Sequence, residues 1–276
     1  MLLYGGAGFG KDFAVTEFRG VTLFRARLLE FPWLGHAFTT RLGGVSEGPF
    51  ATLNLGYGTG DLPERVLANR HLLAAALGYD PARVVAGKQV HGEKVAVVTL
   101  REAGAGALEP DTALEATDGL VTGATGLPLM GFFADCVPIL LADTGNRAVA
   151  VVHAGWRGTA RRIVHRVLGV MRAFLEAVPA RCVVAIGPAI GPCCFVVDKA
   201  VAATFSSWGE KVVWRQGDKW HVDLWEANRQ LLIAQGVPQD QIVVLKVCTS
   251  CHPELFFSHR RDGPKTGRMA AVIFRR

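Results

Sequence analysis

The chain has 276 residues, of which 50% are hydrophobic and 20% are charged. This composition is typical of a globular protein with a sizeable core and excludes a wholly disordered chain. The formal charge of +6 favours anionic partners, but no nucleic-acid recognition motif accompanies it, so we expect phosphate-bearing small molecules as ligands rather than nucleic acid.

No apolar run reaches the ~20 residues that a membrane span needs. The start of the chain, MLLYGGAGFGKDFAV, lacks the basic, apolar and small-residue regions of a secretory signal. We therefore expect a cytoplasmic protein without membrane contact, in which the six cysteines stay reduced. The sequence gives no indication of the oligomeric state.

The first twenty residues, 1–20, are predicted to be an N-terminal extension of uncertain role. Within them, GGAGFGKD (residues 5–12) nearly matches the phosphate-binding loop GxxxxGK[ST]. Asp12 replaces the required hydroxyl residue, however, and no strand fits before the loop. Residues 39–61 form a glycine-punctuated segment that is too long for a routine connection. Arg41 and Ser46 in this segment could contact an anion.

Hydrophobic periodicity predicts helices and strands in mixed order along the rest of the chain. The predicted strands are residues 21–27, 34–40, 83–86, 94–100, 118–122, 127–134, 137–142, 148–152, 182–186, 212–215, 220–224, 242–247 and 269–274. The predicted helices are residues 61–77 (starting at Asp61 or at Pro63), 156–177 (the longest), 198–205 and 225–235. Because these elements do not repeat as βαβ units, we expect an α+β fold: a single domain over residues 21–276 with mixed β-sheets flanked by helices.

The segment GFFADCVPILLADTGNRAVAVVHAGWRGT (residues 131–159) contains two apolar runs around the polar turn TGNR, which predicts a β-hairpin. In the expected register Cys136 lies opposite Gly155, so that its side chain shares a face with that of His153. The two side chains are then diagonal neighbours, roughly 7–8 Å apart or less. With Asp135 beside them, they indicate a metal or nucleophile site, or else a structural cysteine with a hydrogen-bonded histidine.

Three further segments bear on this pair. His91, in KQVHG between two predicted strands, could point into a cleft or lie on the surface. GWRGT (residues 155–159) begins a predicted helix, where free backbone N–H groups and Arg157 would favour an anion, unless it is an ordinary helix start. FFSHRRDG (residues 256–263), together with Lys265 and Arg268, could cover a substrate or be a solvated cationic tail.

The cysteine patterns carry less weight. CTSCH (residues 248–252) fits a haem-attachment motif, which normally needs export, and also half of a zinc site. We expect no second pair of zinc ligands, because the adjacent Cys193 and Cys194 would point apart in an extended strand. HGE (residues 91–93) matches the HxE of zinc nucleobase deaminases, but PCC (residues 192–194) is too short for the second half of that motif.

The sequence resembles a known protein family. The resemblance rests on six motifs that occur in this order: KQVHG, DGLVT, ADCVPILLAD, VVHAGWRGT, AIGPAIGPCC and CTSC…FFSHRRDG…TGR. With TTRLGGVSEGPFATLNLG before them, they are similar to the bacterial laccase-domain family, whose members are described as multicopper polyphenol oxidases and as purine nucleoside phosphorylases. The resemblance extends from about residue 39 to residue 273. It fails at residues 1–20 and at His259, where a tyrosine is expected.

The resemblance implies a single α+β domain of cysteine-hydrolase-like fold and a zinc site made of His91, Cys136 and His153. Copper is possible instead, because imidazole and thiolate suit both metals. The implied activities are those of a transferase and a hydrolase. They are phosphorolysis of inosine, adenosine and methylthioadenosine to the free base and ribose 1-phosphate, and deamination of adenosine. Purine nucleosides and phosphate are the implied partners.

A zinc ion with three protein ligands keeps a fourth position for water or substrate, as catalytic sites require. Asp135 is the predicted carboxylate that orients the ligands, and it joins Cys136, His91 and His153 in the predicted catalytic set. The predicted substrate- and phosphate-binding residues are Arg41, Ser46, Lys88, Arg157 and Arg261.

Other functions stay open on the sequence. The first is a copper-dependent polyphenol oxidase, although eight scattered histidines without an HxH motif argue against a multicopper centre. The second is a non-catalytic, zinc-stabilised binding module. The third is an enzyme that uses an activated cysteine nucleophile, since Cys–His pairs serve acyl transfer.

Overall fold

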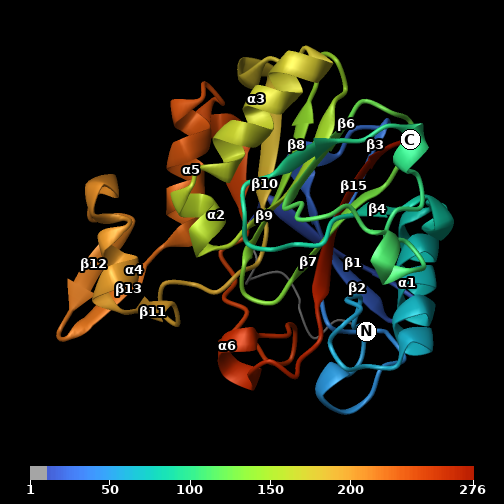
Figure 1. Cartoon of the computed structure of the whole chain (residues 1–276), viewed down its shortest axis with the longest axis horizontal. Helices are drawn as coiled ribbons and strands as arrows, with labels where there is room; N and C mark the ends of the chain where they lie inside the picture. The colour runs from blue at the N-terminus through green and yellow to red at the C-terminus, as the bar shows by residue number, and fades with distance from the viewer. Residues whose placement is uncertain (1–10) are drawn as a thin grey trace.

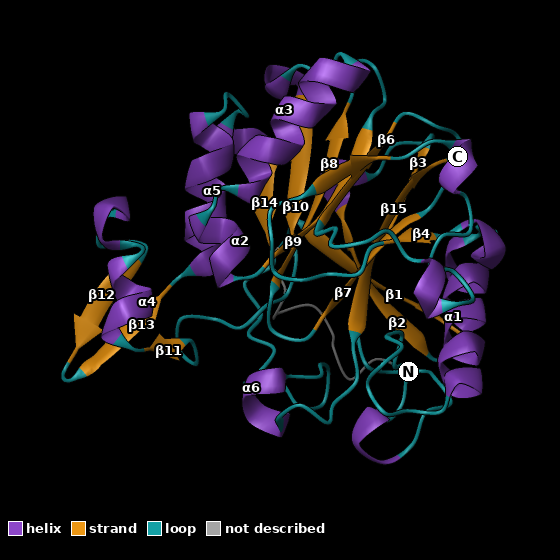
Figure 2. Cartoon of the chain, in the orientation of Figure 1, coloured by secondary structure: helices purple, strands orange, loops and turns teal. Residues whose placement is uncertain are grey.

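Two six-stranded sheets stacked face to face form the centre of the fold in the computed structural model, which describes residues 11–276 (Figure 1). The segment GGAGFGKD (residues 5–12) therefore lies almost wholly outside the described residues. Helices cover the outer faces of the two sheets, and a small three-stranded sheet stands to one side (Figure 2).

The first sheet has, in spatial order, β1 (Phe13–Phe18), β2 (Val21–Ala26), β3 (Leu34–Thr39), β15 (Met269–Arg275), β7 (Leu129–Phe133) and β4 (Val85–Ala86). The second has β14 (Ile242–Val244), β10 (Cys182–Ile186), β8 (Val137–Asp143), β9 (Val149–Ala154), β6 (Gly119–Thr122) and β5 (Val95–Val97). The small sheet has β11 (Val196–Val197), β13 (Lys219–Val222) and β12 (Val213–Gln216). Residues 13–18 of the predicted N-terminal extension thus form a strand that pairs with β2.

The helices are α1 (Pro63–Leu77), α2 (Trp156–Ala160), α3 (Ile163–Leu175), α4 (Lys199–Ala203), α5 (Leu224–Ala234) and α6 (His259–Asp262). Short 3-10 turns occur at Arg27–Leu29, Gly48–Phe50, Pro81–Arg83, Leu100–Glu102, Pro110–Thr112, Pro179–Arg181, Ser206–Trp208 and Gln239–Gln241. Among residues 11–276, no helix is both long and apolar enough to cross a bilayer.

Alternating side chains of β8 explain how the layers are held together. Leu140 and Ala142 face the first sheet and belong to the core between the sheets. Ile139 and Leu141 point the other way, into the core shared with α3 and α5. Successive residues of a strand face opposite sides, and both sides are buried here, which is why this stretch of sequence is continuously apolar.

The predicted hairpin is confirmed, with Val137 opposite Ala154 and Pro138 opposite His153, in the expected register. The mixed α+β architecture is also confirmed. The prediction of one long helix over residues 156–177 is wrong. Arg162 adopts a left-handed conformation (φ 61°) between α2 and α3, and this break lets α3 bury Ile163 and Val167 against the second sheet.

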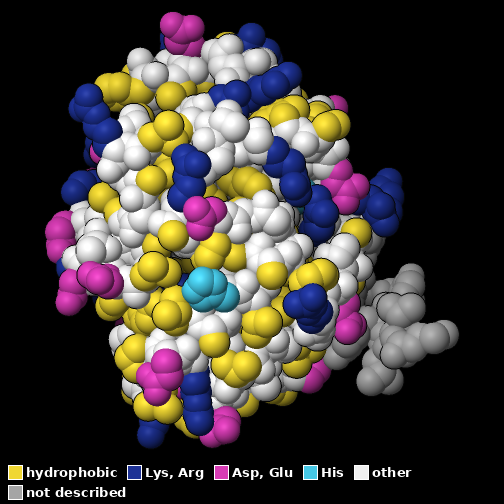
Figure 3. All heavy atoms as spheres, turned by 90° about the vertical axis from the view of Figure 1, so that its right-hand side faces the viewer, with side chains coloured by type: hydrophobic (Ala, Val, Ile, Leu, Met, Phe, Trp, Pro, Cys, Tyr) yellow, Lys and Arg dark blue, Asp and Glu magenta, His cyan; other side chains and the backbone are white. Residues whose placement is uncertain are grey.

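The face of the molecule that carries α1 mixes Lys and Arg with Asp, Glu and hydrophobic side chains (Figure 3). Positive side chains do not gather in one patch on this face. This face therefore carries no basic patch of the kind that binds nucleic acid.

Buried His36 on β3 makes stability depend on pH. Its Nε2 accepts a hydrogen bond from the backbone N–H of Ala26 at 3.0 Å, and burial, followed by the charge of Arg25, lowers its pKa to about 3. The unfolded chain binds a proton below about pH 6.5 that the folded chain does not bind. The free energy of unfolding should therefore fall as the pH drops from about 6.5 toward 3.

We expect protonation of His36 in the unfolded chain to lower the free energy of unfolding by about 2 kcal/mol between neutral pH and pH 5. Urea unfolding of the parent and of His36→Gln at both pH values measures it. The variant should lose about 2 kcal/mol less on acidification than the parent does. An equal loss in both proteins would contradict the assignment to His36.

Candidate metal centre

Three potential metal ligands meet at one edge of the second sheet. Because β8 and β9 are antiparallel neighbours, the start of β8 lies beside the end of β9. Cys136 immediately precedes β8, His153 lies near the end of β9, and His91 comes from the loop after β4. A sulfur or ring nitrogen of each lies within 4.8 Å of the other two, and the two imidazole rings are 4.9 Å apart, edge to face.

Asp118, which immediately precedes β6, holds both histidines in place. Its Oδ1 lies 2.7 Å from Nδ1 of His153 and also accepts the backbone N–H of His91 at 3.0 Å. Its Oδ2 accepts the N–H groups of Val90 and Gly92, at 3.2 and 2.9 Å. One buried carboxylate therefore fixes the His153 ring and shapes the loop in which His91 adopts φ 59°.

This contact defines the proton position on His153. A carboxylate only accepts hydrogen bonds, so Nδ1 of His153 carries a proton, and Nε2 is the nitrogen left for a metal ion, which would displace any proton there. Burial alone would raise the pKa of Asp118, but the His153 contact and the backbone N–H groups lower it overall. Asp118 therefore stays ionised, and His153 presents the nitrogen that a metal ion needs.

Asp135, the carboxylate that the sequence predicted to orient the ligands, makes its hydrogen bonds to other groups. Its Oδ1 accepts the hydroxyl of Thr249 at 2.6 Å and its Oδ2 accepts the backbone N–H of Arg260 at 2.6 Å. Neither His91 nor His153 is bonded to it. Asp135 instead adopts φ 89° at the entry to β8 and fastens a distant loop to the wall of the site.

Charge balance favours the thiolate of Cys136. Burial raises the pKa of this thiol, but the attraction and hydrogen bonding of His153, supported by His91, outweigh burial and lower the pKa to about 6. Burial lowers the pKa of His153, but the charge of Cys136 and the bond to Asp118 raise it to about 9. A thiolate beside two imidazoles is a donor set that suits zinc or copper.

Gly155, at the end of β9, leaves room for this cluster. A Cβ atom at this position would lie 3.0 Å from Sγ of Cys136 and 3.1 Å from Cδ2 of His91. Since both distances are shorter than ordinary contacts, any larger residue would push the ligands apart. The glycine between VVHA and WRGT is therefore part of the site rather than only a helix start.

The cluster opens into a cavity of about 510 Å³, a size that suits a small-molecule ligand. The lining includes all three candidate ligands and Asp135. Its apolar wall is formed by Phe132, Trp156, Ile190, Phe195 and Leu224, and its polar side chains include Tyr57, Lys88, Gln89, Arg70, His259, Arg260 and Arg268. Within residues 256–263, only His259 and Arg260 line the cavity; they begin α6, which the Ser258 hydroxyl caps.

Three guanidinium groups that line the cavity, those of Arg70, Arg260 and Arg268, lack a carboxylate partner within residues 11–276. Arg70 is 4% exposed, donates to the carbonyl oxygens of Leu55, Gly106 and Ala107 and lies against the ring of Tyr57. Arg268 donates to the carbonyl oxygens of Thr266 and Gly267. Uncompensated positive charge in a cavity attracts an anionic ligand.

Of the residues predicted to bind substrate or phosphate, Lys88 lines the cavity, where it pairs with Glu115 at 2.6 Å. The other four are absent from the lining. Ser46 donates to Asp61 at 2.6 Å, and Arg157 lies over the ring of its neighbour Trp156. Arg41 and Arg261 are held by backbone carbonyl oxygens, of Ala51 and Pro253 and of Thr249 and Phe256 respectively.

Sequence reasoning missed Asp118, Arg70, Tyr57 and the placement of Arg268. Asp118 had a signal, since it opens the DGLVT motif. Pairing that strand with β9 puts Asp118 beside His153, where the N–H of His153 donates to the carbonyl of Asp118 at 2.8 Å. For Arg70 the sequence offered no such signal, because an arginine in a predicted helix is usually solvent-exposed and nothing in the sequence marks this one as buried.

The fold and the site define an α+β protein with a candidate catalytic metal centre: three protein donors beside a ligand-sized cavity. The chain belongs to the family described as "Multi-copper polyphenol oxidoreductase laccase", which matches residues 35–276. The curated relatives in this family carry enzyme names, and the chain is an enzyme.

Two relatives and one solved structure illustrate the similarity. "Purine nucleoside phosphorylase YlmD" of Geobacillus stearothermophilus is 44% identical over 243 residues, which cover 86% of this chain and 89% of that protein. "Adenosine deaminase RL5" of an unknown prokaryotic organism is 39% identical over 246 residues, covering 87% and 94%. The crystal structure of YlmD from Geobacillus stearothermophilus superposes with a TM-score of 0.90 at 41% identity, covering 96% of this chain and 99% of that one.

Proposed function

We propose that this enzyme is a zinc-dependent purine nucleoside phosphorylase that also deaminates adenosine. The observation that carries the proposal is the His91–Cys136–His153 cluster at the edge of a cavity that contains uncompensated guanidinium groups. The names of the relatives, one phosphorylase and one adenosine deaminase, point to the same pair of reactions.

The donor set fits zinc. Cys136 would bind as a thiolate and His91 and His153 as neutral imidazoles, with the His153 ring oriented by Asp118. When bound, zinc supplies a Lewis acid beside the cavity, which serves water activation in deamination and charge stabilisation in phosphorolysis. The cavity provides the space for a substrate next to these donors.

We assign phosphate binding to Arg268, with Arg260 as a second cation of the cavity lining. Arg268 lines the cavity together with the three candidate metal ligands. Burial lowers the pKa of its guanidinium, and the charges of Cys136 and Asp135 oppose that shift. Arg260 lines the cavity too, and its backbone is fixed by Asp135. A guanidinium can bind two phosphate oxygens at once, which positions the dianion for attack.

The lining of the cavity also offers groups that suit a purine base. Phe132 and Trp156 offer aromatic surface, and the buried hydroxyl of Tyr57 has no hydrogen-bond partner among the residues the structure describes. Burial raises the pKa of Tyr57, so the hydroxyl keeps its proton and can donate to a ring nitrogen or carbonyl of the base.

The reaction balances without an oxidant. In phosphorolysis a phosphate oxygen bonds to the anomeric carbon, the glycosidic bond breaks, and the base leaves with that electron pair and takes up a proton. In deamination water adds to the ring carbon that carries the amino group, and ammonia leaves.

The family description names copper oxidases, but among residues 11–276 only two histidines join a candidate metal cluster, fewer than a multicopper centre needs.

Incubation of purified, metal-quantified protein with inosine, with and without phosphate, tests the proposal. Hypoxanthine and ribose 1-phosphate should form only in the arm that contains phosphate. Equal release of the base with and without phosphate, or no release in either arm, would reject the proposal that the enzyme is a phosphorylase. Oxidation of a phenol by protein purified without added copper would favour the oxidase instead.

Arg268→Met is expected to raise the KM for phosphate by at least about tenfold, the loss of about 1.4 kcal/mol of binding. Deamination of adenosine uses no phosphate and should change much less. Arg172→Met, an exposed arginine of α3, is the matched control and should leave both reactions unchanged. Equal losses of the two reactions in Arg268→Met would speak against a phosphate-specific role.

A further inference from the structure

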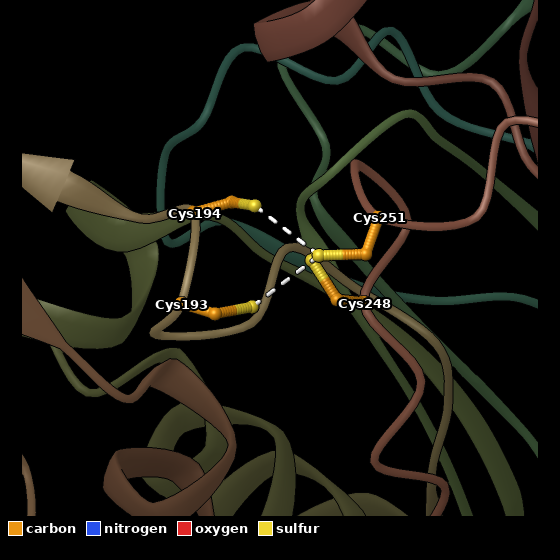
Figure 4. A group of neighbouring side chains, drawn as sticks. All are labelled: Cys193, Cys194, Cys248 and Cys251. Atoms are coloured by element: carbon orange, nitrogen blue, oxygen red, sulfur yellow. Dashed lines mark hydrogen bonds between the residues drawn. The ribbon is translucent and has the colours of Figure 1, made fainter.

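A second cluster of potential metal ligands lies outside the candidate metal centre. Cys193 and Cys194 come from the turn after β10, and Cys248 and Cys251 from the turn after β14. The four sulfur atoms lie within 4.8 Å of one another. They point inward toward a common centre (Figure 4), with Cys251 Sγ at 3.6 Å from Cys193 Sγ and 3.4 Å from Cys194 Sγ.

The prediction that Cys193 and Cys194 point apart is wrong, because they do not lie in a strand. The N–H groups of Cys194 and Phe195 both donate to the carbonyl of Gly191, at 3.0 and 2.8 Å. This tight turn swings both sulfur atoms to the same side. The N–H of Thr249 donates to the carbonyl of Ala189 at 2.9 Å, which holds the two cysteine-bearing turns side by side.

We propose that Cys193, Cys194, Cys248 and Cys251 form a structural zinc site. In a tetrahedral site with Zn–S bonds of about 2.3 Å, neighbouring sulfur atoms are about 3.8 Å apart, close to the observed separations. A disulfide needs about 2.05 Å. Four protein ligands close the coordination sphere, so this ion holds structure and does no chemistry.

The surroundings of the cluster suit bound thiolates. The N–H of Gly191 donates to Sγ of Cys248 at 3.2 Å, a contact that stabilises negative charge on a metal-bound sulfur. Arg260 donates to the carbonyl of Cys194 at 2.8 Å and Arg261 to that of Ser250 at 3.2 Å. Arg261 is already paired with Asp262 at 2.7 Å, whereas the guanidinium of Arg260 has no carboxylate partner among the described residues and offsets part of the negative charge that four thiolates leave after they bind a divalent ion.

The site would fasten one wall of the active-site cavity. The first turn carries Ile190 and Phe195 and the second leads to Arg260, all of which line the cavity. Both turns also bond to Asp135, through the N–H of Ile190 at 2.9 Å and the hydroxyl of Thr249 at 2.6 Å. The metal ion would thus hold this wall next to Cys136. This inference does not depend on which reaction the enzyme performs.

Metal analysis of full-length protein, purified with reductant and without added metal, tests the proposal. Cys251→Ser and Cys193→Ser should each lose one zinc ion per chain and keep the ion at the His91–Cys136–His153 cluster, with a lower Tm. Cys182→Ser, at a buried cysteine outside both clusters, should lose none. Zinc content equal to that of the parent in Cys251→Ser and Cys193→Ser would overturn the site.

A second measurement does not depend on the folding of these variants. Cys136→Ala removes the other thiolate, so cobalt loaded into this variant should show the intense sulfur-to-metal charge-transfer absorption of a tetrathiolate site. Its absence would overturn the proposal. So would an intact mass that is lower by the hydrogens lost on disulfide formation in freshly isolated parent protein.

Discussion

Cys136→Ala is expected to lose the metal ion of the His91–Cys136–His153 cluster together with nucleoside cleavage and deamination. The thiolate is the only anionic donor among the three candidate ligands, and two imidazoles without it leave a site of much lower affinity. We expect both activities to fall at least about 100-fold, which corresponds to about 2.7 kcal/mol. Metal analysis and both assays on the same preparation measure the effect.

The matched control is Cys182→Ser. Cys182 is buried in β10, where burial and then the charge of Asp143 raise the pKa of its thiol to about 12, so it is chemically inert. Serine can keep the contact with the carbonyl of Val178 that the thiol makes. This variant should retain metal and activity. A metal-free but fully active Cys136→Ala protein would show that Cys136 is only a packing residue.

Asp118→Asn is expected to weaken metal binding by about 10- to 100-fold. The amide of asparagine brings N–H groups to a position that now accepts from Val90, His91 and Gly92. It also removes the negative charge that orients the His153 ring. Both histidines are therefore disturbed by one change. Competition with a chromophoric zinc chelator measures the affinity.

Asp135→Asn separates this account from the prediction made on sequence alone. If Asp118 orients the ligands, Asp135→Asn keeps its metal affinity, and its effect falls on the wall formed by Thr249 and Arg260. A larger loss of metal in Asp135→Asn than in Asp118→Asn would restore the original assignment and contradict the geometry described here.

Local patterns in the sequence predict much of the fold. The hairpin register follows from two apolar runs and a polar turn, and it places Cys136 and His153 on one face. The start and end of α1 follow from Pro63 and Gly78, which has the left-handed conformation common after a helix. In contrast, the break at Arg162 has no local signal, because it serves the packing of α3 against the sheet.

The site was predictable only where chemistry and family resemblance coincide. Three metal donors are recognisable by residue type, but the positions of Arg41, Ser46 and Arg261 depend on which carbonyl and carboxylate groups the fold brings to them. Tertiary contacts hold these side chains away from the cavity. The convergence of Cys193 with Cys251 likewise depends on two turns that are far apart in the sequence.

The most direct test of the account is anomalous X-ray diffraction from crystals of the enzyme grown without added metal, with data on both sides of the zinc edge. We expect a zinc peak among His91 Nε2 or Nδ1, Cys136 Sγ and His153 Nε2, with a coordination position open to the cavity. The absence of any metal peak there, or a metal enclosed by four protein ligands at that position, would contradict a catalytic centre.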